Sequence, residues 1–190
     1  MEDRMAGTGV RGLVLVAIVV FAAALKADPA AGQCDFDWKP GEGVPGVDGT
    51  VRTLTTWDPD GNGPQQELLI VGGEFTIAGD VIANNIAAWD GDSWQPLGSG
   101  MGGAVPHVRA LAVYNGELIA GGQFNTAGDV DANYIARWNG SSWQALGGGM
   151  NDIVESLTIY NGELIAGGFF TTAGSVTAHY IACWDGSSWQ

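Results

Sequence analysis

Short runs of alternating apolar and polar residues predict β-strands over most of the chain. Residues 108–114 (VRALAVY) have the period-two pattern of a strand with one buried face. The pair Asn115-Gly116 follows, which favours the two-residue type I′ turn of a β-hairpin. Next come the apolar run ELIAGG (117–122), a third run ending in IARW, and a fourth, SWQAL. The pattern predicts four short antiparallel strands and gives no helical period after the N-terminal segment.

This four-strand pattern recurs along the chain. Segment 68–94 returns at 117–143 and again at 163–189, and its phenylalanine (Phe75, Phe124, Phe170) recurs after 49 and then 46 residues. The repeated glycine pairs and tryptophans are Gly72, Gly73, Trp89 and Trp94; Gly121, Gly122, Trp138 and Trp143; and Gly167, Gly168, Trp184 and Trp189. A repeat domain over 34–190 is expected, with units at about 38–94, 95–143 and 144–190, the first of them longest.

The repeat length of about 45 to 50 residues is the period of β-propeller blades. A single four-stranded sheet cannot bury both faces, so neighbouring sheets must stack on each other. Glycine pairs would let backbone pack closely where the stack is crowded, and the tryptophans would supply contact area between sheets. Carbohydrate stacking is the alternative role for the tryptophans, and their fixed repeat positions favour packing.

At these residues the chain resembles the kelch superfamily of β-propellers. Gly121-Gly122, Trp138 and Trp143 follow the order of a kelch unit, as do Gly167-Gly168, Trp184-Asp185 and Trp189. Tryptophan replaces the usual tyrosine, and the turn between the aromatic positions is shorter. The phrase AGGxFxTAG…IAxWDGSSW is also similar to repeats of uncharacterised secreted bacterial proteins and of the fungal Rax2-like family. The resemblance implies an all-β fold of about three kelch-like blades.

Three units are fewer than the roughly four to eight blades of a closed propeller. The pattern begins with a segment like a fourth strand at Trp38 and stops at Gln190. An incomplete ring is therefore expected. Either the chain is part of a longer gene product, or blades of another chain associate with its open edges.

The N-terminal segment predicts export. Arg4 and Arg11 precede the apolar run Gly12–Leu25, which has the length of a signal-peptide core and is short for a membrane span. Residues 1–33 are expected to be a signal peptide and short linker, cleaved after Ala27 or Gly32, with a retained membrane anchor as the alternative. The two cysteines, Cys34 and Cys183, could pair or stay separate.

The net charge of the chain limits the classes of partner that it is expected to bind. The formal net charge is −14, with 7 Lys and Arg against 21 Asp and Glu. Such a surface repels phosphate backbones, so nucleic acid is not expected as a partner. No membrane insertion is expected after signal cleavage, and an unknown extracellular protein or glycan is the expected partner.

An acidic loop is the strongest candidate for a metal site. Residues 58–63 (DPDGNG) match the opening of a calcium-binding loop, in which Asp58, Asp60 and Asn62 would supply oxygen ligands. The twelfth position is Leu69 where a glutamate should stand, and Glu67 could substitute for it. The same residues also favour a long hairpin connection without metal, which is the preferred interpretation. No other cofactor is expected.

Other polar residues are weaker candidates for sites. Asp80, Asp129 and Asp131 follow a repeated Ala-Gly pair and could line one rim of the ring, although solvated loop tips are the simpler interpretation. Ser175 stands where Asp129 stands in the preceding unit. The two histidines, His107 and His179, are not expected to converge on copper or zinc.

No catalytic residues are predicted from these patterns. The expected function is that of an exported, non-enzymatic binding or structural module. A fragment of a propeller enzyme, galactose-oxidase-like or glycan-active, with its catalytic residues beyond Gln190 is the alternative. A calcium-stabilised structural repeat centred on 58–62 is a third.

Overall fold

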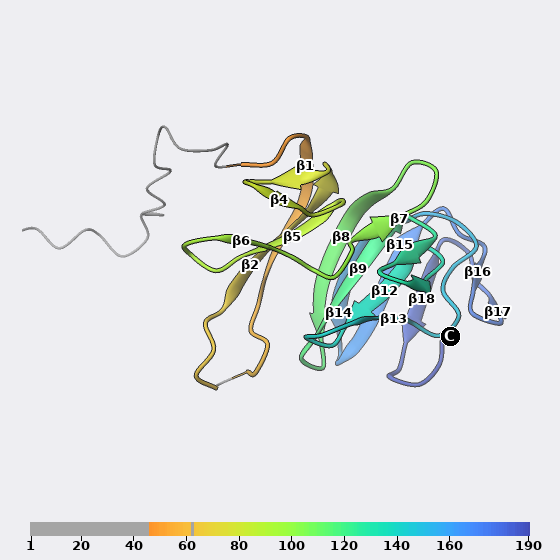
Figure 1. Cartoon of the computed structure of the whole chain (residues 1–190). Helices are drawn as coiled ribbons and strands as arrows, with labels where there is room; N and C mark the ends of the chain where they lie inside the picture. The colour runs from red at the N-terminus through yellow and green to blue at the C-terminus, as the bar shows by residue number, and fades with distance from the viewer. Residues whose placement is uncertain (1–45, 62) are drawn as a thin grey trace, which may run out of the picture. The chain divides into compact units, whose positions relative to one another are not determined.

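The described part of the chain is all-β. A computed structural model describes residues 46–61 and 63–190, so the predicted signal peptide, Cys34 and Asn62 lie outside the described residues. Within those ranges the regular structure consists of β-strands in small antiparallel sheets, with no helix (Figure 1). None of these sheets closes on itself in the described ranges. The predicted all-β class is confirmed for this part of the chain.

Three larger sheets follow each other along the chain with the same strand order. Sheet 1 has the order β1-β2-β5-β6, sheet 2 the order β8-β9-β12-β13, and sheet 3 the order β14-β15-β18. Sheet 1 consists of Thr50–Trp57 (β1), Leu68–Glu74 (β2), Ile86–Trp89 (β5) and Trp94–Pro96 (β6). Sheet 2 consists of His107–Tyr114 (β8), Glu117–Gln123 (β9), Ile135–Trp138 (β12) and Trp143–Ala145 (β13). Sheet 3 consists of Val154–Tyr160 (β14), Glu163–Gly168 (β15) and Ile181–Trp184 (β18), and Trp189 adds a single bridge to Trp184.

The first hairpin of sheets 2 and 3 is set by its Asn-Gly pair. Asn115 and Gly116 have φ values of 51° and 81°, and Asn161 and Gly162 have φ values of 52° and 83°. Two successive residues in the left-handed region define the type I′ turn, whose twist matches that of the flanking strands. The predicted hairpins are therefore confirmed.

Each unit also contains a small hairpin that the sequence pattern did not reveal. These hairpins are β3–β4 (Ile77–Ala78, Val81–Ile82), β10–β11 (Thr126–Ala127, Val130–Asp131) and β16–β17 (Thr172–Ala173, Val176–Thr177). The segment before the first strand of each sheet adds to the small hairpin of the same unit: Val47 pairs with Ala78, β7 (Met101–Gly102) with β10, and Met150 with Ala173. Strands of two residues are too short to show a hydrophobic period, which is why the prediction missed them.

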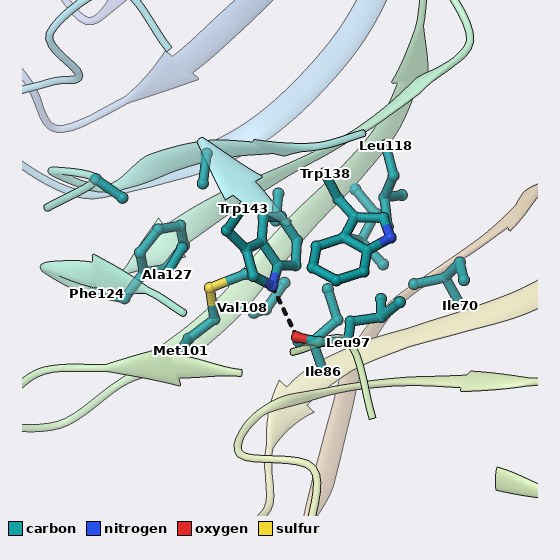
Figure 2. Close-up of a cluster of buried hydrophobic side chains, with 14 of the residues drawn as sticks. Ile70, Ile86, Leu97, Met101, Val108, Leu118, Phe124, Ala127, Trp138 and Trp143 are labelled. Atoms are coloured by element: carbon teal, nitrogen blue, oxygen red, sulfur yellow. Dashed lines mark hydrogen bonds between the residues drawn. The ribbon is translucent and has the colours of Figure 1, made fainter. Parts of the chain in front are cut away.

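The three sheets pack face to face in chain order. Strand β8 contacts both β1 and β14, and in Figure 1 it lies between them. The downstream face of sheet 1, with Ile70 and Ile86, shares one buried cluster with the upstream face of sheet 2, with Val108, Leu118 and Trp138 (Figure 2). We call this contact seam 1–2.

A second buried cluster joins sheets 2 and 3 in the same way. Ile119 and Ile135 lie on the downstream face of sheet 2, and they share the cluster with Val154 and Leu164 on the upstream face of sheet 3. We call this contact seam 2–3. Both seams therefore bury equivalent residues of the repeat, as stacking of like sheets requires.

Candidate functional site

Two of the three tryptophan pairs lie within the seams, Trp138–Trp143 in seam 1–2 and Trp184–Trp189 in seam 2–3. Trp138 and Trp143 face each other across β12 and β13, with ring centroids 5.3 Å apart and planes tilted by 52°. Trp89–Trp94 and Trp184–Trp189 repeat this arrangement at 5.3 Å and 55°. Tilted rings at this distance have a favourable quadrupole interaction beyond the area that they bury. Trp143 is 4% exposed and Trp189 also 4%, so their faces are covered by protein.

The second tryptophan of a pair also ties its sheet to the preceding unit. The indole Nε1 of Trp143 donates a hydrogen bond to the carbonyl oxygen of Leu97 at 2.8 Å (Figure 2). Trp189 Nε1 donates in the same way to Leu146, at 3.1 Å. Since both atoms of each bond are buried, these bonds satisfy polar groups that would otherwise be costly in the core. Sugar stacking needs an open ring face, which neither indole offers.

The glycine pairs mark two close approaches of backbone. A Cβ on Gly72 would lie 2.5 Å from Val108 Cγ1 of the next sheet, and a Cβ on Gly121 would lie 2.6 Å from Val154 Cγ1. The first glycine of the pair therefore makes room for the valine of the following sheet. A Cβ on the second glycine, such as Gly122, would overlap the backbone carbonyl of His107 in its own sheet.

A bulge next to the second glycine turns one side chain out of each first strand. The register shifts between Val51 and Thr53, between Val108 and Ala110, and between Val154 and Ser156. The bulged residues are Arg52, Arg109 and Glu155, at the same position of the repeat. Bulges re-aim a side chain and raise the local twist of the strand.

The bulged residues belong to a row of charged groups that crosses all three sheets. We call Arg52, Glu74, His107, Arg109 and Glu155 the charged row. Arg52 Nη2 lies 3.0 Å from Glu74 Oε2, and His107 Nδ1 lies 3.5 Å from the same oxygen. Arg109 of sheet 2 pairs with Glu155 of sheet 3.

The charged row is a link between sheets rather than a set of free reactive groups. The hydrogen bond from Arg52 holds the pKa of Glu74 below its ordinary value, and the charges of His107 and Arg109 act in the same direction. Glu74 is therefore an ionised partner for sheet 2. His107 is buried, and its Nδ1 makes no hydrogen bond within the described residues. The sequence signal for this row is the charged second residue of the repeated VRTL, VRAL and VESL.

A capped turn joins the third and fourth strands of each unit. Asp90 Oδ1 accepts hydrogen bonds from the backbone N–H of Asp92 and Ser93, and Asp185 Oδ1 accepts them from Ser187 and Ser188. Asn139 makes the same two bonds with its side-chain oxygen in the middle unit. These backbone hydrogen bonds are the main reason that the pKa values of Asp90 and Asp185 lie below the ordinary aspartate value.

Because of these two aspartates, we expect the free energy of unfolding to depend on pH in the acid range. A carboxyl whose pKa is lowered on folding stabilises the protein above its unfolded pKa of about 3.9, and this contribution disappears as the pH falls through the folded value. We expect the double variant Asp90→Asn, Asp185→Asn to lose less stability than the wild type between about pH 5 and pH 2. Urea unfolding across that range measures the difference.

The middle unit supplies the matched control for this experiment. Asn139→Asp adds a titrating cap where the chain has an amide, so its stability should fall more steeply with acid than that of the wild type. Identical pH profiles for all three proteins would show that these turns do not link stability to pH.

The predicted calcium loop forms the connection between β1 and β2. Asp58 Oδ1 accepts the backbone N–H of Asp60 at 3.2 Å, and Asp60 Oδ2 accepts that of Gln65 at 3.1 Å. Asp60 and Glu67 are exposed, and Asn62 lies outside the described residues. The hydrogen bonds of Asp58 and Asp60 are those of a turn. Among the described residues no three His, Cys, Asp or Glu side chains form a group that could hold a metal ion.

The remaining polar candidates are scattered over the units. Asp80, Asp129 and Asp131 are exposed at the small hairpins, where Ser175 also lies. His107 is the first residue of β8. His179 is exposed before β18. The structure therefore brings His107 into the charged row and leaves the others at loops.

Cys183 lies on the downstream face of sheet 3. Its Sγ donates a hydrogen bond to Glu163 Oε2 at 3.2 Å. Burial and this neighbouring carboxylate raise the pKa of the thiol. A thiol with a raised pKa is a weak nucleophile at neutral pH. Pairing with Cys34 stays a prediction, since that residue is outside the described part.

A surface cavity of about 390 Å³ lies beside the last tryptophan pair. It lies between the β16–β17 hairpin and the capped turn of the third unit, and three serines contribute to its wall. The lining residues are Gly147, Gly174, Ser175, Val176, Trp184, Ser187, Ser188 and Trp189. Such a wall can offer hydrogen bonds to a polar ligand.

No family model matches the chain, and no curated protein matches it. Between residues 46 and 190, Asn62 aside, no helix is long and apolar enough to cross a membrane.

Proposed function

We propose that the chain is an exported, non-enzymatic binding or structural module built from kelch-like β-propeller blades. Sheets 1, 2 and 3 are the blades, and the seams are the contacts between neighbouring blades. One observation carries the proposal: in both seams the recurring tryptophans and glycines are occupied in packing one sheet on the next. Trp143, for example, is buried in seam 1–2 with its indole N–H bonded to Leu97.

The charged groups of the seams support the same conclusion. Arg52, Arg109 and Arg137 are each paired with a glutamate of the described residues. An acid or base in catalysis needs a reactive group free to meet a substrate. These groups instead hold strands and sheets together. We therefore assign ligand contact to the exposed hairpins.

The small hairpins are the proposed contact surface for a ligand. Their inward positions repeat, whereas the exposed position after the valine changes from Ile82 to Asp131 to Thr177. A rigid scaffold that carries variable loops is the usual arrangement of a binding module. The cavity beside Trp184 lies at one of these hairpins, and a glycan or an extracellular protein is the proposed ligand class.

Export is tested by expressing the full chain in a bacterial host and measuring the intact mass of the protein recovered outside the cytoplasm. We expect a mature protein that begins after Ala27 or Gly32, because the apolar run Gly12–Leu25 has the length of a signal-peptide core. Arg11→Glu should retain more precursor, and Lys39→Glu makes the same change of charge outside the predicted signal peptide. Full-length protein held in the membrane would instead support the anchor.

Binding is tested with the exported protein on a glycan array and on immobilised extracellular matrix. Saturable binding without change of the ligand supports the proposal. Oxidation or hydrolysis of a bound glycan would contradict it and support the enzyme alternative.

A further inference from the structure

Both outer faces of the sheet stack carry exposed large apolar side chains. On the downstream face of sheet 3, Tyr160 is 65% exposed and Ile181 is 62% exposed. On the upstream face of sheet 1, Val51 is 40% exposed and Leu54 is 59% exposed. Large apolar side chains gathered on one face mark an interaction surface.

The same repeat positions are buried inside the stack. Ile86 and Ile135, which correspond to Ile181, are both 0% exposed in seams 1–2 and 2–3. Val108 and Val154, which correspond to Val51, are also 0% exposed. In seams 1–2 and 2–3, the downstream face of one sheet packs on the upstream face of the next. The outer face of sheet 3 is such a downstream face, and the outer face of sheet 1 is such an upstream face.

The glycine pair shows that the two halves fit. Val108 fills the space above Gly72, and Val154 fills the space above Gly121. The equivalent Gly167 of sheet 3 has no such valine, and a Cβ there would meet Ser156 Oγ at 2.8 Å. Val51 is the residue of sheet 1 that corresponds to Val108 and Val154, so in a second copy it is the counterpart of the valine that Gly167 lacks.

Charge is also complementary between the two outer faces. Arg109 of sheet 2 pairs with Glu155 of sheet 3, which is one step along the stack. The same step from sheet 3 to the sheet 1 of another copy brings Glu155 to Arg52. These charges are opposite, so electrostatic attraction between the bulged residues favours the contact of sheet 3 with sheet 1 of another copy.

We propose that two copies of this chain associate head to tail, the upstream face of sheet 1 of each copy packing on the downstream face of sheet 3 of the other. The inference rests on the proposed propeller architecture. Two copies of three sheets give six, within the range of about four to eight blades that closes a ring, whereas three copies give nine. A heterologous contact that closes gives a finite assembly instead of a filament.

Sedimentation equilibrium of the exported protein tests the proposal. We expect a dimer for the wild type. Ile181→Asp and Leu54→Asp should each raise the dimer dissociation constant by at least about a hundredfold, because each buries an unpaired carboxylate in the contact. Val105→Asp, at a residue that is 54% exposed in the loop before β8, is the matched control and should leave the dimer intact.

Mixing the two variants tests the head-to-tail geometry. Ile181→Asp retains a native sheet 1 face and Leu54→Asp retains a native sheet 3 face, so the mixture should form a heterodimer through one native contact. A wild-type monomer, a larger open polymer, or a Leu54→Asp variant that still forms dimers would overturn the inference. Near-ultraviolet circular dichroism of the tryptophans shows whether a monomeric wild type is folded. If it is folded, the result contradicts the association but agrees with the proposed blade architecture. An unfolded Ile181→Asp chain would count against both, since the 62% exposed Ile181 should not matter for folding.

Discussion

Replacing Trp143 by alanine is expected to lower the free energy of unfolding by about 3–5 kcal/mol, the usual cost of removing a buried large aromatic side chain. Trp143 is 4% exposed and packs against Trp138 and the cluster of seam 1–2. Trp143→Phe should cost less, about 1–3 kcal/mol, because it keeps most of the apolar contact but leaves the carbonyl of Leu97 without its donor. Urea unfolding followed by circular dichroism measures both values.

Tyr160→Ala is the control for this prediction. The tyrosine is 65% exposed on the outer face of sheet 3, so its loss should change the stability of the monomer by no more than about 0.5 kcal/mol. All variants are compared in the Ile181→Asp background, so that association does not contribute. If Trp143→Ala were as mild as Tyr160→Ala, the tryptophan would not be a packing residue of the seam.

Gly121→Ala is expected to destabilise the protein by about 1–3 kcal/mol, the cost of overpacking a tight core. The added methyl would lie 2.6 Å from Val154 Cγ1 and 3.1 Å from its Cβ, so sheet 3 would have to move away from sheet 2. The cost should be smaller when Val154 is shortened to alanine in the same chain, because the two changes compensate for each other.

Gly167→Ala is the matched control, since it is the same repeat position on the outer face. Its methyl meets only the Ser156 hydroxyl within 3 Å, and that side chain can rotate away. In the Ile181→Asp background we expect a change below about 1 kcal/mol. Equal losses of unfolding free energy at Gly121 and Gly167 would mean that the glycine is needed for the conformation of its own strand and not for the contact between sheets.

Local patterns predicted the strands of the larger sheets. Period-two alternation located first strands such as β8, and Asn115-Gly116 and Asn161-Gly162 gave the hairpin turns, because both signals act over a few neighbouring residues. The short turn between Trp138 and Trp143 was also predicted, and the two residues are register partners.

Features that depend on the alignment of strands were not predicted. The bulges at Arg52, Arg109 and Glu155 arise from pairing with the glycine-ended second strand, and no local pattern encodes that register. The charged row was missed for the same reason, since Glu74 and His107 meet only when two sheets stack. The small hairpins were missed because strands of two residues carry no period.

The sequence of the loop 58–67 is compatible with two different structures. Its residues fit both a cation-binding loop and a long hairpin connection, and composition alone could not decide between them. The described carboxylates of Asp58 and Asp60 accept backbone N–H groups of their own loop. Hydrogen bonds of this kind form only after the backbone is placed, so a one-dimensional pattern cannot contain them.

The most direct measurement of the seams is the nuclear Overhauser effect between the indole N–H of Trp143 and the protons of Leu97, in the unmodified chain. The account predicts this contact, and the equivalent one between Trp189 and Leu146, together with slow exchange of both indole protons with solvent. Fast exchange of both protons and no cross-peak to either leucine would place the rings in open solvent and contradict the stacking of one sheet on the next.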